Sequence, residues 1–152
     1  MSRVTASVEI DAPPDAVWDV VMDPDRLGDW VTIHRRVSRI SDRPLREGST
    51  LAQSLRLRGA TFKVRWKVAE LEGRRAARWE GRGPARSEAH IGYRLVSRDG
   101  GGTCFEYENE FKAPLGPLGA AASRALMGGL PQREANASLQ RLKSLLEHRG
   151  AG

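Results

Sequence analysis

Six polar or aromatic side chains on alternating positions between residues 50 and 112 are the ones that could do chemistry. They are Gln53, Trp66, Trp79, Tyr93, Tyr107 and Asn109. Alternate residues of a β-strand face the same side of a sheet, so all six are expected to face one interior. A few amide, indole and phenol groups in an apolar interior hold a small molecule by directed hydrogen bonds. The pattern therefore indicates a binding site for a small hydrophobic molecule.

Three of these side chains, Tyr93, Tyr107 and Asn109, are also candidates for catalysis. In a dry pocket such groups can donate a proton or stabilise an enolate, as an aldol cyclisation or a dehydration requires. The inward positions carry no carboxylate and no histidine, and the chain has no nucleophile-elbow or glycine-rich phosphate motif. In the alternative interpretation, the aromatic rings fill the core, and Gln53 and Asn109 bond to each other or to water. The residues alone leave both interpretations open.

The expected binding site also includes apolar residues on the same faces and part of the C-terminal helix. The full set is Gln53, Leu55, Phe62, Val64, Trp66, Trp79, Tyr93, Tyr107, Asn109, Ala125 and Gly128. His34 and Arg36 would join it only if their strand turned its edge inward; the sequence leaves their orientation open, and the surface is the commoner place for both. The three histidines and the single Cys104 show no metal-ligand spacing, so neither a metal nor a cofactor is expected.

The elements that must position these residues follow from the hydrophobic period. Residues 4–10 alternate as a strand, and Pro13 and Pro14 open the first of two short helices. From residue 33 onward, six further strands are separated by turn signals without a βαβ rhythm. The strand at residues 33–40 fits neither face cleanly, which a β-bulge would explain. The prediction is an α+β fold with a curved antiparallel seven-stranded sheet.

A long C-terminal helix at residues 118–148 is expected to cover the apolar face of this sheet. Its second half has leucines at helical spacing, from Leu139 to Leu146, and this part is the expected anchor. Towards its start, the same face carries Ala121, Ala125 and Gly128, whose small side chains would leave room for a ligand. Gly128, Gly129 and Pro131 predict a kink that would act as a gate.

Four segments, in their order and spacing, resemble the SRPBCC superfamily. They are VEIDAPPDAVWDVVMDPDRLGDW at residues 8–30, EGS at 47–49, GGT at 101–103 and LQRLKSLLE at 139–147. This superfamily includes START lipid-transfer, polyketide cyclase/dehydrase and birch-pollen-allergen-like proteins. The resemblance covers nearly the whole chain and implies a helix-grip fold, with the sheet wrapped around the C-terminal helix and a deep hydrophobic cavity between them. It implies no single activity, because carriers, cyclases, hydrolases and co-chaperones share the fold.

Length and composition narrow the remaining classes. A chain of 152 residues suits one domain, expected at residues 1–149 with a flexible tail at 150–152. The net charge of +6 comes largely from 21 arginines spread along the chain, which favours a solvated basic surface over a nucleic-acid site. No segment is long and apolar enough for stable membrane insertion. A cytoplasmic protein, monomeric or weakly homodimeric, is expected.

Three functions remain, in order of preference. The first is binding or transport of a lipid, polyketide or isoprenoid-like molecule between the sheet and the C-terminal helix. The second is a metal-independent cyclase or dehydratase of the polyketide cyclase/aromatase type, which would need an ionisable group with a perturbed pKa inside the cavity. The third is a ribosome- or chaperone-associated interaction module, which would have a filled interior and a contiguous external patch.

Overall fold

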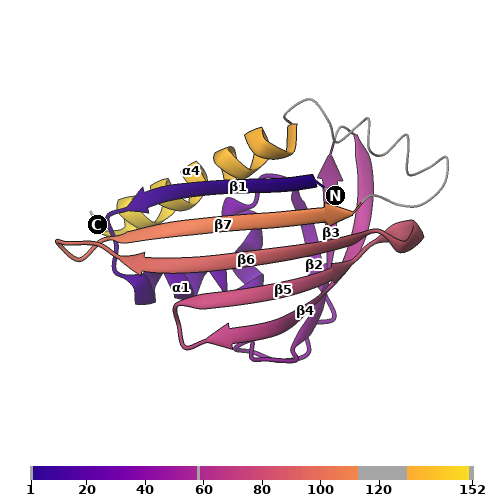
Figure 1. The fold of residues 1–152 in the computed structure, drawn as a ribbon, viewed down its shortest axis with the longest axis horizontal. Helices are drawn as coiled ribbons and strands as arrows, with labels where there is room; N and C mark the ends of the chain where they lie inside the picture. Colours follow the sequence, from indigo (N-terminus) through magenta and orange to yellow (C-terminus); the bar gives the residue numbers. More distant parts are fainter. Residues whose placement is uncertain (1, 58, 113–129, 151–152) are drawn as a thin grey trace.

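Seven strands of the described chain form one curved antiparallel sheet (Figure 1). The structure is a computed structural model that describes residues 2–57, 59–112 and 130–150. In chain order the strands are β1 (Ser2–Ile10), β2 (His34–Ser38), β3 (Thr50–Leu57), β4 (Ala60–Glu72), β5 (Ala76–Arg82), β6 (Glu88–Ser97) and β7 (Thr103–Lys112). Their order across the sheet is β1-β7-β6-β5-β4-β3-β2, so β1 pairs with the last strand of the chain.

The register of the strands places the expected inward residues on one face. Gln53 pairs with Val64, and Tyr93 pairs with Tyr107. In β5, buried Ala77, Trp79 and Gly81 alternate with exposed residues, as expected for a strand with one buried side. The predicted seven-stranded sheet and its faces are therefore confirmed.

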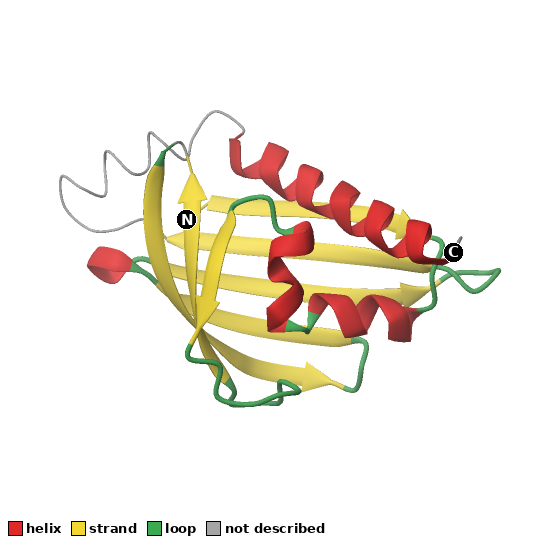
Figure 2. Ribbon diagram, turned by 180° about the vertical axis from the view of Figure 1, so that it is seen from behind, coloured by secondary structure: helices red, strands yellow, loops and turns green. Residues whose placement is uncertain are grey.

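Short helices connect β1 to β2. After Pro13, α1 (Pro14–Val21) buries four apolar residues, and the 3₁₀ turn η1 (Pro24–Arg26) leads into α2 (Leu27–Trp30). A second 3₁₀ turn, η2 (Pro84–Arg86), joins β5 to β6. Figure 2 shows that α1, α2 and α4 all cover the same face of the sheet. The two short helices expected between the first two strands are therefore present.

The C-terminal helix, α4 (Leu130–Gly150), packs mainly against β1 and α2. Leu139, Leu142 and Leu146 are buried, which confirms the predicted anchor. Residues 113–129 lie outside the described residues, and so do the first part of the expected helix and the position of the expected kink at Gly128. So do residues 151–152 of the expected tail. Among the described residues, no helix is both long and apolar enough to cross a membrane.

The predicted bulge in the second strand is present and is located at Arg35. His34 pairs with Leu55 while Arg36 pairs with Ser54, so two steps along β2 correspond to one step along β3. A bulge of this kind changes the direction in which neighbouring side chains point. The two faces of β2 therefore cannot be read by simple alternation.

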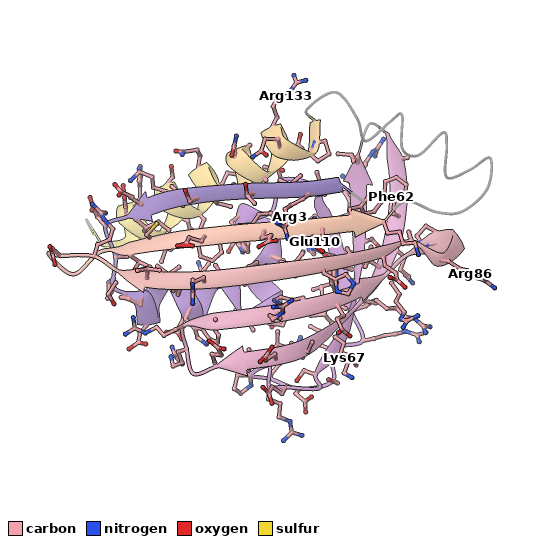
Figure 3. All side chains as sticks on the ribbon, in the orientation of Figure 1. Arg3, Phe62, Lys67, Arg86, Glu110 and Arg133 are labelled. Atoms are coloured by element: carbon pink, nitrogen blue, oxygen red, sulfur yellow. The ribbon has the colours of Figure 1, made fainter. Side chains whose placement is uncertain are left out.

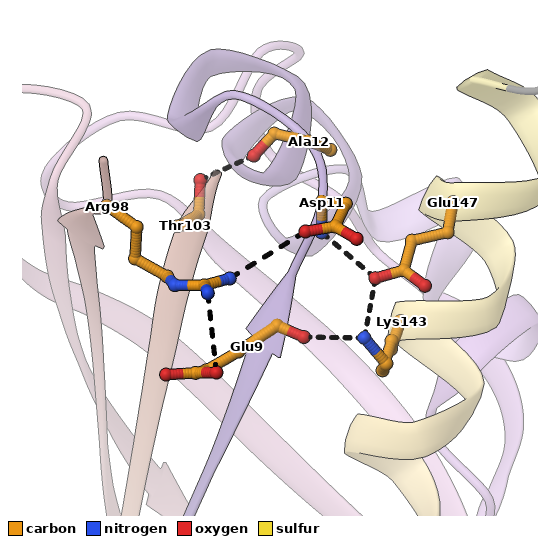
Figure 4. A network of polar contacts seen from close by, with 7 residues as sticks. All are labelled: Glu9, Asp11, Ala12, Arg98, Thr103, Lys143 and Glu147. Atoms are coloured by element: carbon orange, nitrogen blue, oxygen red, sulfur yellow. Dashed lines mark hydrogen bonds and ion pairs between the residues drawn. The ribbon is translucent and has the colours of Figure 1, made fainter. Parts of the chain in front are cut away.

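Two sets of polar contacts hold α4 against the rest of the fold. Near its C-terminal end, Lys143 Nζ donates to the carbonyl of Glu9 at 2.8 Å, and Glu147 accepts from the backbone N–H of Asp11 at 2.9 Å. Arg98, on the turn between β6 and β7, lies 3.4 Å from the carboxylate of Glu9 (Figure 4). This network ties the end of β1 to both α4 and the last hairpin.

The second set joins α4 to the segment after α2. The backbone N–H of Thr32 donates to Ser138 Oγ at 3.0 Å, and the two hydroxyls are 3.2 Å apart. The Thr32 hydroxyl also bonds to the carboxylate of Glu134. Because Ser138 is buried, these bonds fix the segment that leads into β2 relative to α4.

The outer face of the sheet carries charged rows. Arg3 on β1 forms an ion pair with Glu108 on β7 at 2.9 Å. It also pairs with Glu110 on β7 (Figure 3). Exposed cross-strand pairs contribute little stability and mainly favour the correct register.

Candidate functional site

Three hydrogen-bonding side chains form a chain across β2, β3 and β4. Trp66 Nε1 donates to Gln53 Oε1 at 2.9 Å, and Gln53 Nε2 lies 2.9 Å from His34 Nδ1. Gln53 and Trp66 are 6 % and 7 % exposed, so both polar groups are satisfied inside the protein. The sequence pattern placed Gln53 and Trp66 on the inner face, and the structure adds their bond.

His34 is turned towards this inner face, while Arg36 is exposed. The expectation that both side chains lie on the surface is therefore correct for Arg36 and wrong for His34. The bulge at Arg35 explains the difference, because it interrupts the alternation that would otherwise relate the two side chains. Partial burial lowers the pKa of His34 below its ordinary value of 6.5, which favours the neutral imidazole.

A cluster of six aromatic rings covers the centre of the inner face. Trp66 contacts Trp79 at a centroid distance of 6.5 Å, and Trp79 contacts Tyr93 at 6.4 Å. Tyr93 is in turn surrounded by Phe105 at 5.3 Å, Trp30 at 6.1 Å and Tyr107 at 6.2 Å. Trp66–Trp79, Trp79–Tyr93 and Trp30–Tyr93 are edge-to-face pairs, and such pairs stabilise by about 0.5–1.5 kcal/mol beyond the area they bury. Packing of Trp79 and Tyr93 is thus part of their role, as the core interpretation expected.

Three buried polar atoms near this cluster have no hydrogen-bond partner among the described residues. They are Trp30 Nε1, Trp79 Nε1 and Asn109 Oδ1. An unsatisfied buried donor or acceptor costs about 1–3 kcal/mol, and folded proteins contain few of them. The alternative of a bond between Gln53 and Asn109 is wrong, because Gln53 bonds to Trp66 and His34 instead. Within the described part of the chain, two donors and one acceptor of the interior are therefore left without a hydrogen bond.

The two tyrosines on the inner face remain protonated phenols at neutral pH. Burial raises the pKa of Tyr93 far above its usual range. Burial raises the pKa of Tyr107 to about 12, and a hydrogen bond from Asn109 opposes part of that rise. Groups in this state can donate a hydrogen bond to a ligand oxygen, but they are not bases.

The apolar members of the expected set divide into two groups. Val64 packs against the main core, whereas Leu55 and Phe62, which pair with each other, are partly buried and lie outside the main apolar cluster of the described residues. Ala125 and Gly128 lie outside the described residues. The structure thus brings together seven of the expected residues near the aromatic cluster: Gln53, Val64, Trp66, Trp79, Tyr93, Tyr107 and Asn109.

Two residues of the site were missed or undervalued from sequence. Trp30 is not in the set expected from sequence, yet α2 places its indole against Tyr93 and Phe105, and its N–H has no partner among the described residues. Gly81 lies opposite Trp66 on β5. A glycine inside a strand often marks the close approach of another group, so the sequence itself could have indicated a contact at Gly81. Among the described residues, no group of three or more His, Cys, Asp or Glu side chains could hold a metal ion.

Proteins similar to this chain include two from Mycobacterium tuberculosis and one of solved structure. An uncharacterized protein of Mycobacterium tuberculosis is 27 % identical over 129 residues, covering 84 % of this chain and 90 % of that one. A second protein of that organism, named a toxin, is 20 % identical over 127 residues, covering 83 % and 88 %. The structure of the Zhui aromatase/cyclase from Streptomyces sp. R1128 has a TM-score of 0.77 at 18 % identity, covering 98 % of this chain and 95 % of that one.

At 18 % identity the likeness to the aromatase/cyclase shows the fold alone, and that fold is the helix grip. The family is shown by a different comparison. Residues 1–147 match the family model for polyketide cyclase / dehydrase and lipid transport proteins. The SRPBCC resemblance is therefore confirmed, and this chain belongs to the polyketide cyclase/dehydrase and lipid transport family.

Proposed function

We propose that the protein binds a small hydrophobic molecule, such as a lipid, polyketide or isoprenoid, between the inner face of the sheet and α4. The observation that carries this proposal is that Trp79 Nε1 and Asn109 Oδ1 on that face have no hydrogen-bond partner among the described residues. Each is costly while it lacks a partner. A ligand that accepts from the indole and donates to the amide oxygen would recover the cost of both.

The surroundings of these atoms support the same kind of ligand. The aromatic cluster offers apolar surface, and Tyr93 and Tyr107 add phenol groups that stay protonated. An apolar site with a few polar groups selects a mostly hydrocarbon molecule that bears one or two oxygen atoms. Membership of a family that includes lipid transport agrees with such a ligand.

Native mass spectrometry of the protein isolated from its own host is the direct test, and a co-purified apolar molecule is expected. Binding is then compared in Asn109→Leu, using 1-naphthol as the probe and tryptophan fluorescence as the signal. Leucine has nearly the shape of asparagine but no acceptor, so affinity should fall by about threefold to tenfold. Asn136→Leu, at an exposed position on α4, is the control. Unchanged affinity in Asn109→Leu would exclude this residue from the site.

A metal-independent cyclase or dehydratase is the second candidate. The observation in its favour is the buried phenol of Tyr107, which lies in the aromatic cluster and whose pKa burial raises to about 12. Such a phenol can donate to the oxygen of an enolate as negative charge develops there. Conversion of a poly-β-ketone substrate that slows at least tenfold in Tyr107→Phe, with binding retained, would support this activity. Equal rates in the two proteins would contradict it.

A further inference from the structure

The bond from Trp66 determines where the proton of His34 lies. An indole N–H can only donate, so the atom of Gln53 that receives it, at 2.9 Å, is the amide oxygen. The amide nitrogen of Gln53 therefore points at His34 Nδ1, also at 2.9 Å, and it too can only donate. Nδ1 must be the acceptor, and the neutral imidazole carries its proton on Nε2.

The same contact opposes protonation of His34. An imidazolium would place an N–H on Nδ1 directly against the N–H of Gln53, and the hydrogen bond between them would be lost. Rotation of the Gln53 amide does not relieve the conflict, because it would turn the amide N–H towards the indole N–H of Trp66. Partial burial acts in the same direction and lowers the pKa of His34. Gln53 and Trp66 thus hold the ring in one neutral form.

The ring carbon next to Nε2 faces α2. His34 Cδ2, the carbon bonded to Nε2, lies 3.4 Å from the position that a Cβ atom of Gly28 would occupy. Because Gly28 has no side chain, it does not cover that edge of the ring. Among the described residues, no hydrogen bond is formed by Nε2. The ring therefore presents a donor of fixed identity that no described residue uses.

We propose that the Nε2–H of His34 donates a hydrogen bond to an oxygen atom of the bound molecule, and that Gln53 and Trp66 are positioning residues that keep it in this donor form. The inference rests on the proposed function and adds a requirement to it. The molecule must carry a carbonyl, ether or hydroxyl oxygen at the end that lies near α2. His34 has no lone pair free at Nε2, so its role is to select the ligand and not to act as a base.

The proton position is measured first, without any ligand. Two-bond ¹H–¹⁵N correlation spectra at neutral pH distinguish the protonated ring nitrogen from the unprotonated one, and the signals lost in His34→Phe assign this residue. The expected result is a proton on Nε2 alone. Gln53→Glu is the second variant, because its carboxylate accepts from both neighbours and should move a proton onto Nδ1. A proton on Nδ1 in the unmodified protein would overturn the inference.

Selection of the ligand is measured with two probes of the same shape, 1-acetylnaphthalene and 1-ethylnaphthalene, of which only the first has a carbonyl oxygen. His34→Phe should weaken binding of 1-acetylnaphthalene by about threefold to tenfold and that of 1-ethylnaphthalene by about twofold or less. His90→Phe, at an exposed position on β6, should change neither affinity.

The possible results separate the two proposals. Equal losses for both probes in His34→Phe, or no loss for either, would overturn the inference and leave the proposed function standing. Failure of both probes to bind the unmodified protein would overturn the proposed function for aromatic ligands of this size, and the ligand role of His34 with it. In that case, the spectra alone would still decide whether the ring is held with its proton on Nε2.

Discussion

The indole ring of Trp66 on β4 lies over Gly81, its register partner on β5. A Cβ atom at Gly81 would stand 2.5 Å from Cζ3 of the ring and 2.6 Å from Cε3, closer than side-chain carbons approach each other. The missing side chain of Gly81 is thus what allows Trp66 to lie flat and reach Gln53. The proton position proposed for His34 depends, through Gln53, on this one glycine.

Replacement of Gly81 by alanine is therefore expected to displace Trp66. The free energy of unfolding should fall by about 1–3 kcal/mol, the usual cost of overfilling a packed site. The bond from Trp66 to Gln53 should weaken, and the proton of His34 should no longer be confined to Nε2. Urea denaturation and the histidine spectra measure the two effects.

Gly92→Ala on β6 is the matched control, because a Cβ atom there would meet nothing within 4 Å. Its free energy of unfolding should change by about 0.5 kcal/mol or less, or rise slightly as the unfolded chain loses freedom. Similar losses in Gly81→Ala and Gly92→Ala would mean that contact with Trp66 is not the cause.

Stability should decrease as the pH falls below 6.5, in part because of His34. Its pKa is lowered in the folded protein from the ordinary value of 6.5, so between these two values the unfolded chain binds more protons. The contribution is fully present above pH 6.5 and is lost as the pH falls towards the folded pKa. Urea denaturation at pH 7.5, 6.5 and 5.5 should show a smaller decline in His34→Phe than in the unmodified protein. Identical declines would contradict the lowered pKa.

Ser138→Ala should destabilise the protein by about 1 kcal/mol, because the N–H of Thr32 loses its acceptor. Alanine favours a helix more than serine does, which offsets a few tenths of a kcal/mol. Ser144→Ala, at an exposed position on the same helix, isolates that propensity and should be neutral or slightly stabilising. Thermal denaturation of both variants compares them, and a Ser138→Ala protein as stable as Ser144→Ala would show that the bond contributes nothing.

Leu142→Ala should lower the free energy of unfolding by about 2–5 kcal/mol, since Leu142 is fully buried where α4 meets the rest of the core. Leu145 lies one turn further on and is only partly buried, so Leu145→Ala should cost less than half as much. The two variants are compared by urea denaturation. Equal costs would indicate that α4 sits with a different face against the sheet.

The strands and their inner face could be predicted because alternation is a local property. From Thr50 to Phe111 each strand has one polar and one apolar side, so its own residues determine which side is buried. The same reasoning located Gln53, Trp66, Tyr93 and Asn109. It also located the irregular strand around Arg35, since a bulge is the ordinary reason for a broken alternation.

What could not be predicted depends on contacts between distant segments. The direction of His34 follows from the bulge and from Gln53, 19 residues later in the chain. The place of Trp30 against Tyr93 follows from how α2 lies across the sheet, which no local pattern specifies. The alternative of a bond between Gln53 and Asn109 was wrong for the same reason, because two amides on one face of a sheet need not be neighbours.

The pairing of β1 with β7 has a consequence for how the chain reaches its folded form. Val4 pairs with Asn109, so about a hundred residues must be made before the first strand finds its neighbour. Contacts so distant in sequence slow folding, because the chain entropy of closing the loop is lost before the contact forms. During synthesis on the ribosome, the apolar side of β1 therefore stays uncovered until most of the polypeptide has emerged, and at this stage the nascent protein would benefit from a chaperone.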